Sequence, residues 1–384
     1  MKSSNSLSIA KAFGDCLLDT MRSDKNFYFF SPDETTSNKL DVIFEDFDRA
    51  WNLPVKNWDN NLSKDGRIVE MLSENTLFAV LAGYILSGGK GAMTSYEAFF
   101  PIISSQLAQY IKFLRQSREV KWRPDYNALN LLSTSCWQRQ DHNGFTHQNP
   151  ELISTLLAKP SNVVNCFFPI DNNSAKATWD WMMESKNVVN LATFNKIETP
   201  QRIDYNQARF QVTNRGAMIL QNYSDKNPDY IFTAVGDIAT RETIEAMKII
   251  RNELPNYKLR FVSVAALSYN AIGTTENKLT QRDFDEYFTT DKMIFANFHG
   301  YSDTLRSILS RYADAKRLKM YGYQDNGSTT TPLDELARNH CSRFDVAIDF
   351  FLLAGRRDLA KKYIDFLADN RVYAIENGID KIEL

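Results

Sequence analysis

The segment from Tyr230 to Leu267 constrains the fold of this chain most, because it has the pattern of one strand–helix–strand unit. Residues 230–235 and 259–264 are short runs rich in β-branched and aromatic side chains, whereas residues 241–252 between them have helical spacing. Two strands joined by one crossover helix pair in parallel. We therefore predict an α/β protein with parallel strands.

The N-terminal part of the chain alternates between helical and extended patterns in the same way. Apolar side chains three and four residues apart between Ala10 and Met21 predict a helix. Residues 27–30 and 163–168 predict strands. A further helix is expected from Arg67, with the apolar run 77–81 buried on nearly all sides.

A polar stretch from Asn222 to Asp229 precedes the strand–helix–strand unit and is the best candidate for a linker. It suggests a chain of two folded parts. We expect an N-terminal helix or linker at 1–22, a first domain at 23–205, a linker at 206–229 and a second α/β domain at 230–384.

The composition excludes several kinds of partner and site. With 45 Lys and Arg against 47 Asp and Glu, the chain has no overall positive field to attract nucleic acid. The longest stretches without a charged side chain, 75–89 and 261–275, are shorter than the roughly 20 residues of a membrane-spanning helix. We therefore expect no nucleic-acid or membrane partner.

Two further patterns concern location and metal binding. The N-terminus lacks the apolar core of a secretory signal, which favours a cytoplasmic location. The four cysteines lie far apart with no CxxC spacing, so we predict no metal site in this chain.

Two of the four histidines, His142 and His147, lie in the short run from Arg139 to His147. Their spacing does not match the i,i+4 spacing of a helical metal site. Imidazole and amide groups gathered in a loop can bind a small anion or move protons near neutral pH. A surface loop with two exposed histidines explains the pattern equally well, so these residues alone leave both interpretations open.

Five motifs are spread through nearly the whole chain. They are Ser31–Asn38 (SPDETTSN), Glu70–Glu74 (EMLSE), Thr94–Phe99 (TSYEAF), Arg139–His147 (RQDHNGFTH) and Gly327–Pro332 (GSTTTP). In sequence and order they resemble motifs of the phosphoketolase family, and specifically of the C-terminal half of these thiamine-diphosphate enzymes, which cleave ketose phosphates. The resemblance implies a pyrimidine-binding domain at 23–205 followed by a transketolase-type C-terminal domain at 230–384, each a sheet layered between helices.

The same resemblance implies roles for individual residues. Glu74 matches the acid that hydrogen-bonds the aminopyrimidine ring of the cofactor and thereby favours its proton-removing tautomer. Tyr96 and Phe99 match aromatic residues that wall the cofactor. Asn143 and His147 match groups that contact the reacting intermediate, so with Glu74 they are the implied catalytic residues. Contacts to sugar phosphate and inorganic phosphate are implied for Ser37, Lys39, Arg118, His142, Asn143 and Lys196.

Some positions depart from the family pattern. Lys39 stands where these enzymes usually carry arginine, so a point charge replaces a bidentate fork. Asn75 stands where the family usually has histidine, and residues 194–198 differ from the usual AGKQP. We expect these departures to affect substrate preference.

The function implied by the resemblance is that of the pyrimidine-domain half of a phosphoketolase-type aldehyde-lyase, inactive without the N-terminal half. It implies thiamine diphosphate shared with that partner half, and Mg²⁺ held by the partner and not by this chain. The expected assembly is a homodimer or a heteromer. Two alternatives remain open at this point: a non-catalytic stabilising or regulatory partner of a complete phosphoketolase, and a transketolase-like transferase.

Overall fold

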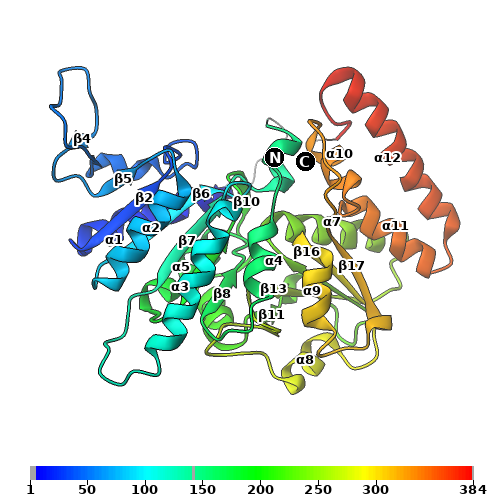
Figure 1. The fold of residues 1–384 in the computed structure, drawn as a ribbon. Helices are drawn as coiled ribbons and strands as arrows, with labels where there is room; N and C mark the ends of the chain where they lie inside the picture. Colours follow the sequence, from blue (N-terminus) through cyan, green and yellow to red (C-terminus); the bar gives the residue numbers. More distant parts are fainter. Residues whose placement is uncertain (1–5, 141–142, 383–384) are drawn as a thin grey trace.

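The computed structural model describes residues 6–140 and 143–382, which form two helix-covered sheets lying side by side and a small two-stranded sheet (Figure 1). The small sheet pairs β1 (Ser6–Ser8) with β10 (Glu198–Pro200) in antiparallel orientation. It therefore attaches the N-terminal end of the described chain to the segment that follows the central strands.

The first sheet has ten strands in the order β15-β14-β8-β9-β7-β6-β2-β5-β3-β4. All neighbouring pairs from β8 to β4 are parallel, whereas β14 and β15 add on in antiparallel orientation. The strands are β2 (Phe27–Ser31), β3 (Arg49–Ala50), β4 (Leu62–Ser63), β5 (Ile68–Glu70), β6 (Lys90–Tyr96), β7 (Leu129–Thr134), β8 (Val164–Phe167), β9 (Val189–Thr193), β14 (Ala266–Ser268) and β15 (Ala271–Ile272).

Helices cover both faces of this sheet because its strands are apolar on both sides. In β2, Phe29 packs with α1 (Ile9–Ser23) and α5 (Asn172–Glu184), whereas its neighbour Phe30 packs with α2 (Glu74–Leu86) and α3 (Ser104–Ser117). Successive side chains of a strand point to opposite faces, so both faces need a cover. The remaining helices of this part are α4 (Glu151–Leu157) and α6 (Tyr205–Phe210).

The second sheet has the order β11-β13-β12-β16-β17, in which only β11 is antiparallel to its neighbour. Its strands are β11 (Ala217–Ile219), β12 (Tyr230–Val235), β13 (Leu259–Val264), β16 (Ile294–Tyr301) and β17 (Leu318–Tyr323). Its helices are α7 (Asp237–Glu253), α8 (Gln281–Phe288), α9 (Ser302–Leu309), α10 (Pro332–Arg338), α11 (Arg343–Leu353) and α12 (Arg357–Asn377).

The predicted strand–helix–strand unit is confirmed. Strands β12 and β13 have the predicted bounds, are joined by α7 and pair in parallel, with Tyr230 opposite Leu259. Helix α7 begins four residues earlier than expected, directly after Gly236. Among the described residues, no helix combines the length and the apolarity that a membrane crossing needs.

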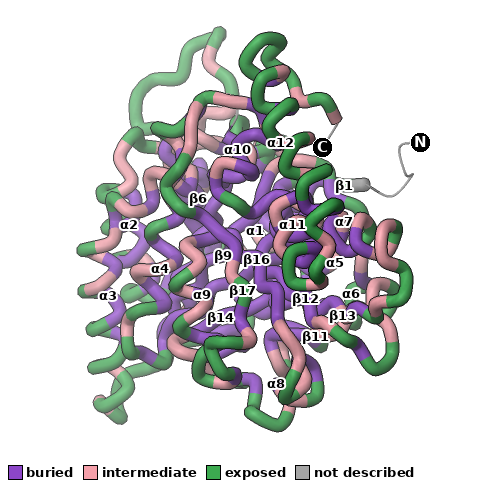
Figure 2. Tube along the Cα trace, turned by 90° about the vertical axis from the view of Figure 1, so that its right-hand side faces the viewer, coloured by how far each residue is buried: buried purple, intermediate pink, exposed green. Residues whose placement is uncertain are grey.

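The two large sheets share one hydrophobic core. A single cluster of buried side chains joins α2, α3 and α4 of the first part to β12, β13 and β16 of the second. At its centre, Phe168 lies edge-on to Phe298 with 5.7 Å between the ring centroids. Figure 2 shows buried strands of both sheets in the middle of the molecule and the more exposed α12 on its surface. The relative position of the sheets is therefore set by packing.

The structure differs from the expected course of the chain in two segments. Residues 67–70 belong largely to β5, so the helix begins only at Glu74, and Val80 within the run 77–81 is 42% exposed. The expected linker 206–229 contains the end of α6 and strand β11. Beyond it, β14 and β15 return to the first sheet, so the domain boundary stays an expectation.

We expect Phe13→Ala to lower the free energy of unfolding by about 3–5 kcal/mol, because it empties a fully buried aromatic site. Phe13 stacks on Phe194 at 4.4 Å and lies edge-on to Trp179 at 6.2 Å, which docks α1 against the first sheet. Urea denaturation measures the change. The half-exposed Leu353→Ala is the control and should cost below about 1 kcal/mol. Equal losses in both variants would contradict this packing.

Candidate functional site

The residues expected to form a site follow the carboxyl ends of four adjacent parallel strands. In the order β9-β7-β6-β2, the segments at these ends carry Lys196, His147, Tyr96 and Ser37. Carboxyl ends of parallel strands lie at the same edge of a sheet, where open α/β proteins bind their ligands. Sequence positions more than 150 apart thus meet at one edge.

An aromatic wall forms the centre of this edge. Tyr96, the last residue of β6, lies parallel to Phe99 at a centroid distance of 6.0 Å and an interplanar angle of 6°. The His147 imidazole lies edge-on to both rings, 5.3 Å from Phe99 and 6.5 Å from Tyr96. All three side chains are only partly buried, so they present flat apolar and polarisable surface to a ligand.

Two lysines stand beside this wall. The Lys196 ammonium donates to the Ser37 carbonyl at 2.9 Å and lies 4.9 Å from the Tyr96 ring centroid. The Lys39 ammonium donates to the Lys196 carbonyl at 2.6 Å. Burial lowers the pKa of Lys196 from its usual value. Two neighbouring ammonium groups make this corner a local binding site for an anion, although the whole chain is nearly neutral.

Two carboxyl groups lie close to Tyr96 and its neighbour Ser95. Glu74, the first residue of α2, is half-buried and accepts a bond from the Ser95 hydroxyl at 3.5 Å. Glu34 accepts the Tyr96 backbone N–H at 2.8 Å. Burial raises the pKa of Glu34 to about 8, and the negative charge of Glu74 adds to that rise against the opposing effect of the Tyr96 bond. Glu34 is therefore mainly protonated at neutral pH.

The loop with the histidine motif is held by the second part of the chain. His142 lies outside the described residues, whereas Asn143 is exposed and its carbonyl accepts the Thr146 hydroxyl at 3.4 Å. The Thr146 hydroxyl also contacts Nδ1 of His147 at 2.9 Å. Gly144 has a φ of 67°, and a Cβ there would lie 2.0 Å from the Thr329 hydroxyl oxygen, so the GSTTTP motif packs directly on this loop.

Arg118 does not join the other predicted residues. It follows α3, and its guanidinium donates to the carbonyls of Asn162 at 3.2 Å and Asn187 at 3.1 Å. These two residues precede β8 and β9, so Arg118 lies at the amino ends of the strands. A helix of this length carries the chain about 20 Å from one edge of the sheet to the other. We leave Arg118 out of the candidate site for this reason.

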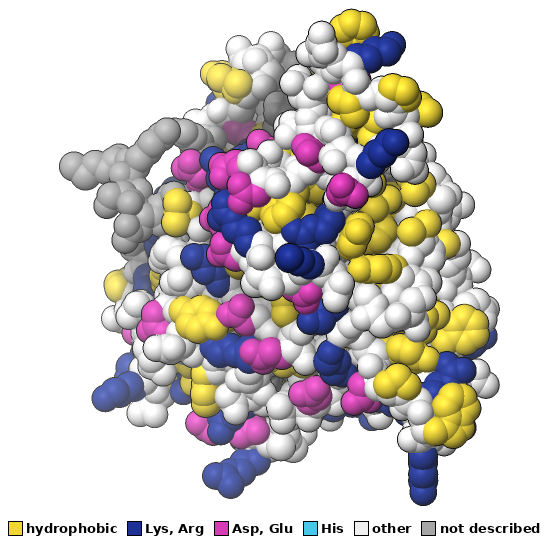
Figure 3. All heavy atoms as spheres, turned by 90° about the vertical axis from the view of Figure 1, so that its left-hand side faces the viewer, with side chains coloured by type: hydrophobic (Ala, Val, Ile, Leu, Met, Phe, Trp, Pro, Cys, Tyr) yellow, Lys and Arg dark blue, Asp and Glu magenta, His cyan; other side chains and the backbone are white. Residues whose placement is uncertain are grey.

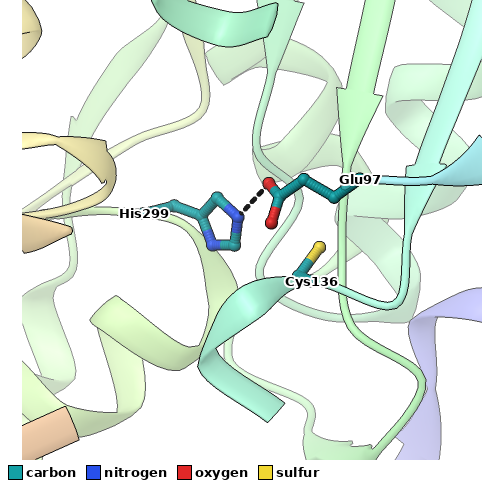
Figure 4. Close-up of side chains that lie close together, drawn as sticks. All are labelled: Glu97, Cys136 and His299. Atoms are coloured by element: carbon teal, nitrogen blue, oxygen red, sulfur yellow. Dashed lines mark hydrogen bonds and ion pairs between the residues drawn. The ribbon is translucent and has the colours of Figure 1, made fainter. Parts of the chain in front are cut away.

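A buried polar cluster lies directly below the aromatic wall. Glu97 Oε1 and His299 Nε2 are 2.6 Å apart, and Cys136 is close by (Figure 4). One metal ion bound to both atoms would need them about 3 Å apart or more. The Cys136 thiol donates to the Phe194 carbonyl at 3.1 Å, and burial raises its pKa far above the usual value. This geometry is that of a hydrogen-bonded pair and not of a metal centre.

A second buried link lies beside Lys196. Both carboxylate oxygens of Asp237, at the start of α7, accept bonds of 3.0 Å from the backbone and side-chain nitrogens of Asn195. Since Asn195 precedes Lys196, the second sheet holds the lysine segment in place.

Our sequence analysis did not single out Glu34, Glu97 or Asn195. Glu34 and Glu97 lie inside the motifs SPDETTSN and TSYEAF, so these motifs could have identified both residues. Asn195 and its partner Asp237 carry no local pattern that would have identified them.

We expect Glu34→Gln to reduce the pH dependence of stability between about pH 4.5 and 8. In this window the folded protein keeps a proton that the unfolded chain releases, so stability falls as pH rises, by up to about 1.4 kcal/mol per pH unit. The variant removes that slope. Urea denaturation at several pH values measures it, with the exposed Glu376→Gln as control. A wild-type slope in Glu34→Gln would show that Glu34 is ionised in the fold.

Comparison with known proteins identifies relatives over nearly the whole chain. Residues 11–185 match the model for D-xylulose 5-phosphate/D-fructose 6-phosphate phosphoketolase, and residues 196–384 match its C-terminal domain. Probable phosphoketolases of Thermosynechococcus vestitus and Synechocystis sp. are each 37% identical over 97% of this chain, which covers 47% and 48% of those proteins. The chain thus spans about half the length of the curated relatives it matches.

Solved structures show the same fold at low sequence identity. Transketolase from Leishmania mexicana has a TM-score of 0.64 at 14% identity, with 94% of this chain and 47% of that chain covered. A structure described as a split gene transketolase, inactive β4 tetramer, has a TM-score of 0.61 at 14% identity, with 92% and 99% covered. These likenesses confirm the predicted transketolase-type α/β fold. On the matches of its two halves, the chain belongs to the phosphoketolase family.

Proposed function

We propose that this chain is the pyrimidine-binding half of a thiamine-diphosphate-dependent phosphoketolase. The proposed enzyme cleaves a ketose phosphate with inorganic phosphate into acetyl phosphate, a shortened aldose phosphate and water. The observation that carries the proposal is the meeting of Glu74, Tyr96, His147 and Lys196 at one strand edge in a member of this family.

The residues at this edge fit the pyrimidine ring of the cofactor. Tyr96 and Phe99 offer parallel aromatic faces, and Glu74 stands at the start of α2 with its carboxyl group half-buried. When bound, thiamine diphosphate supplies a carbon nucleophile and an electron sink for cleavage of the ketose. In this proposal Glu74 holds the proton on the pyrimidine ring, and the aromatic wall orients the ring and excludes water.

Lys39 and Lys196, which we call the lysine corner, fit the anionic ends of the substrates. Lys196 and Lys39 can each donate to phosphate oxygens once they exchange their present carbonyl partners for the ligand. Ser37, Asn143 and His142 complete the proposed phosphate and sugar contacts. His147 stands between the aromatic wall and the Thr146 hydroxyl, where it can move a proton to or from the reacting sugar.

The donor groups favour a partner that holds the diphosphate and its Mg²⁺. Among the described residues, the one group of three or more possible metal ligands is Glu97, Cys136 and His299. One carboxylate with a thiol and an imidazole does not suit Mg²⁺, which prefers oxygen ligands in octahedral geometry. Because this chain spans about half the length of its relatives, we assign Mg²⁺ and the diphosphate to a separate N-terminal half.

The exposed face of α2 supports the same division. Directly after Glu74, the outward positions of this helix are Asn75, Thr76, Ala79, Val80, Gly83 and Leu86, and none of them is charged. Phe113 on the adjacent α3 is 56% exposed, and Leu72 before α2 is 84% exposed. Figure 3 faces this side of the molecule and shows several groups of hydrophobic side chains. A surface of this kind is typical of an interface.

We infer that the diphosphate-binding half covers this face, because the face adjoins Glu74 and the chain spans about half of its relatives. The split gene transketolase, which this chain covers over 99% of its length, is described as an inactive β4 tetramer. We expect this chain, too, to be inactive without its partner.

The first test of the proposed function is phosphate-dependent formation of acetyl phosphate. The native chain is purified with its partner, and the product is measured as its hydroxamate, with thiamine diphosphate and Mg²⁺ present. Glu74→Gln should lower kcat by about 100-fold or more, because an amide cannot supply the proton. Glu376→Gln on α12 is the control and should be as active as wild type. Activity without phosphate, on addition of an aldose acceptor, would instead indicate a transketolase-like transferase.

The second test asks at which edge of the first sheet the sugar phosphate binds. Lys196→Ala should raise the KM for sugar phosphate by about tenfold or more, since it removes a charge-assisted contact worth roughly 1.5–3 kcal/mol. Arg118→Ala should leave that KM unchanged, because Arg118 lies at the opposite edge. Steady-state kinetics of both variants measures the KM for sugar phosphate. A raised KM in Arg118→Ala alone would place the phosphate elsewhere.

The third test concerns the partner surface. Val80→Asp and Phe113→Asp should weaken association with the N-terminal half by about 100-fold, because each would bury an unpaired charge. Ile375→Asp, on the exposed face of α12, should leave association intact. Analytical ultracentrifugation of the mixed halves measures the effect. Normal association of both α2 and α3 variants would place the partner on another face.

A further inference from the structure

We propose that Glu97 and His299 form a positioning link by which the second sheet holds the aromatic wall of the site. Neither residue contacts the proposed ligands. Instead, the pair joins the end of β6, the beginning of the loop after β7, and β16 of the second sheet. Two experiments test this link. The activity measurement rests on the proposed function, whereas the amide hydrogen exchange measurement does not.

Glu97 connects three segments through one buried side chain. It lies between Tyr96 and Phe99, and its backbone N–H donates to the Thr134 carbonyl at 2.8 Å. Its Oε1 contacts His299 at 2.6 Å, and its Oε2 accepts the Trp137 backbone N–H at 2.9 Å. A shift of this carboxylate therefore moves the segment that carries both wall residues.

His299 is held on every side. Its Nδ1 lies 3.0 Å from Oε1 of Gln138, and its backbone carbonyl accepts the indole N–H of Trp137. Gly236 packs against it from the start of α7, where a Cβ would lie 2.9 Å from that of His299 and φ is 118°. Figure 4 shows the ring pointing toward the Glu97 carboxylate.

The charge state of the ring agrees with this arrangement. Both ring nitrogens face carbonyl or carboxylate oxygens, which an imidazolium with two N–H donors satisfies together. Burial alone lowers the pKa of His299, but the negative charges of Glu97 and Asp237 outweigh it, so the pKa lies above the usual value. The link is therefore a buried hydrogen bond between Glu97 and His299, with a further hydrogen bond to Gln138.

The link acts on the aromatic wall and not on the lysine corner. Lys196 is held separately, through the bonds of its neighbour Asn195 to Asp237. Loosening the Glu97–His299 pair should therefore affect the orientation of Tyr96 and Phe99 more than phosphate binding. In kinetic terms, kcat should fall while the KM for sugar phosphate stays nearly constant.

The chain offers a matched control for this proposal. The hydroxyls of Ser154 on α4 and Thr304 on α9 also bond across the two parts, at 2.7 Å. Neither hydroxyl is bonded to Tyr96, Phe99 or His147, so Ser154→Ala removes a hydrogen bond between the same two parts and leaves the bonds of Glu97 in place.

The structural arm uses amide hydrogen exchange of the full chain. In His299→Ala, the amides of residues 96–99 and of Trp137 should exchange about tenfold faster than in wild type. His299→Gln should restore most of the protection, because its amide can donate to Glu97. Ser154→Ala should leave these amides unchanged. Wild-type protection in His299→Ala, or equal loss in Ser154→Ala, would overturn the proposal.

The activity arm uses the enzyme assembled with its partner. His299→Ala should lower kcat about tenfold or more with the KM within about twofold of wild type, and His299→Gln should recover most of kcat. A normal kcat in His299→Ala would overturn the link. If His299→Ala does not fold, Glu97→Leu carries both arms with the same expected changes, because a leucine side chain accepts no hydrogen bond. Wild-type protein that forms no acetyl phosphate would refute the proposed function, and hydrogen exchange would still decide on the link.

Discussion

Parallel pairing of four adjacent strands is the constraint on which the rest of the site depends. Because β9, β7, β6 and β2 run in the same direction, the segments after them all emerge at one edge of the sheet. Tyr96, His147, Lys196 and Ser37 meet there although they are far apart in sequence. The chemistry of the edge then follows from its residues, since aromatic faces, two carboxyl groups and two ammonium groups lie together there.

The second sheet and its helices hold this edge in place. The phenylalanine pair Phe168 and Phe298 lies within a core that both sheets share, and this core brings β16 and α7 close to the site. Two buried acids, Glu97 and Asp237, then tie this strand edge to the second part of the chain. Such buried polar contacts define one arrangement of the two sheets, because breaking them leaves a charge without a partner.

The surface beside the site has a different character from the rest of the molecule. The outward face of α2 is uncharged from Asn75 to Leu86, whereas the surface helix α12 carries many charged side chains. An uncharged helix face next to Glu74 fits a site that is completed by association. Membership of the phosphoketolase family and coverage of about half of its relatives agree with that interpretation.

The sequence alone determined the fold class, the strand–helix–strand unit at 230–264, the family and most of the residues at the strand edge. These features depend on local periodicity and on short motifs, which can be recognised without knowing which segments are neighbours. Only the tertiary structure decided that Arg118 lies at the opposite edge, that Val80 faces outward, and that Glu97 pairs with His299, 202 positions away. Such contacts depend on strand order and on packing between sheets, and neither leaves a pattern within a single segment of the chain.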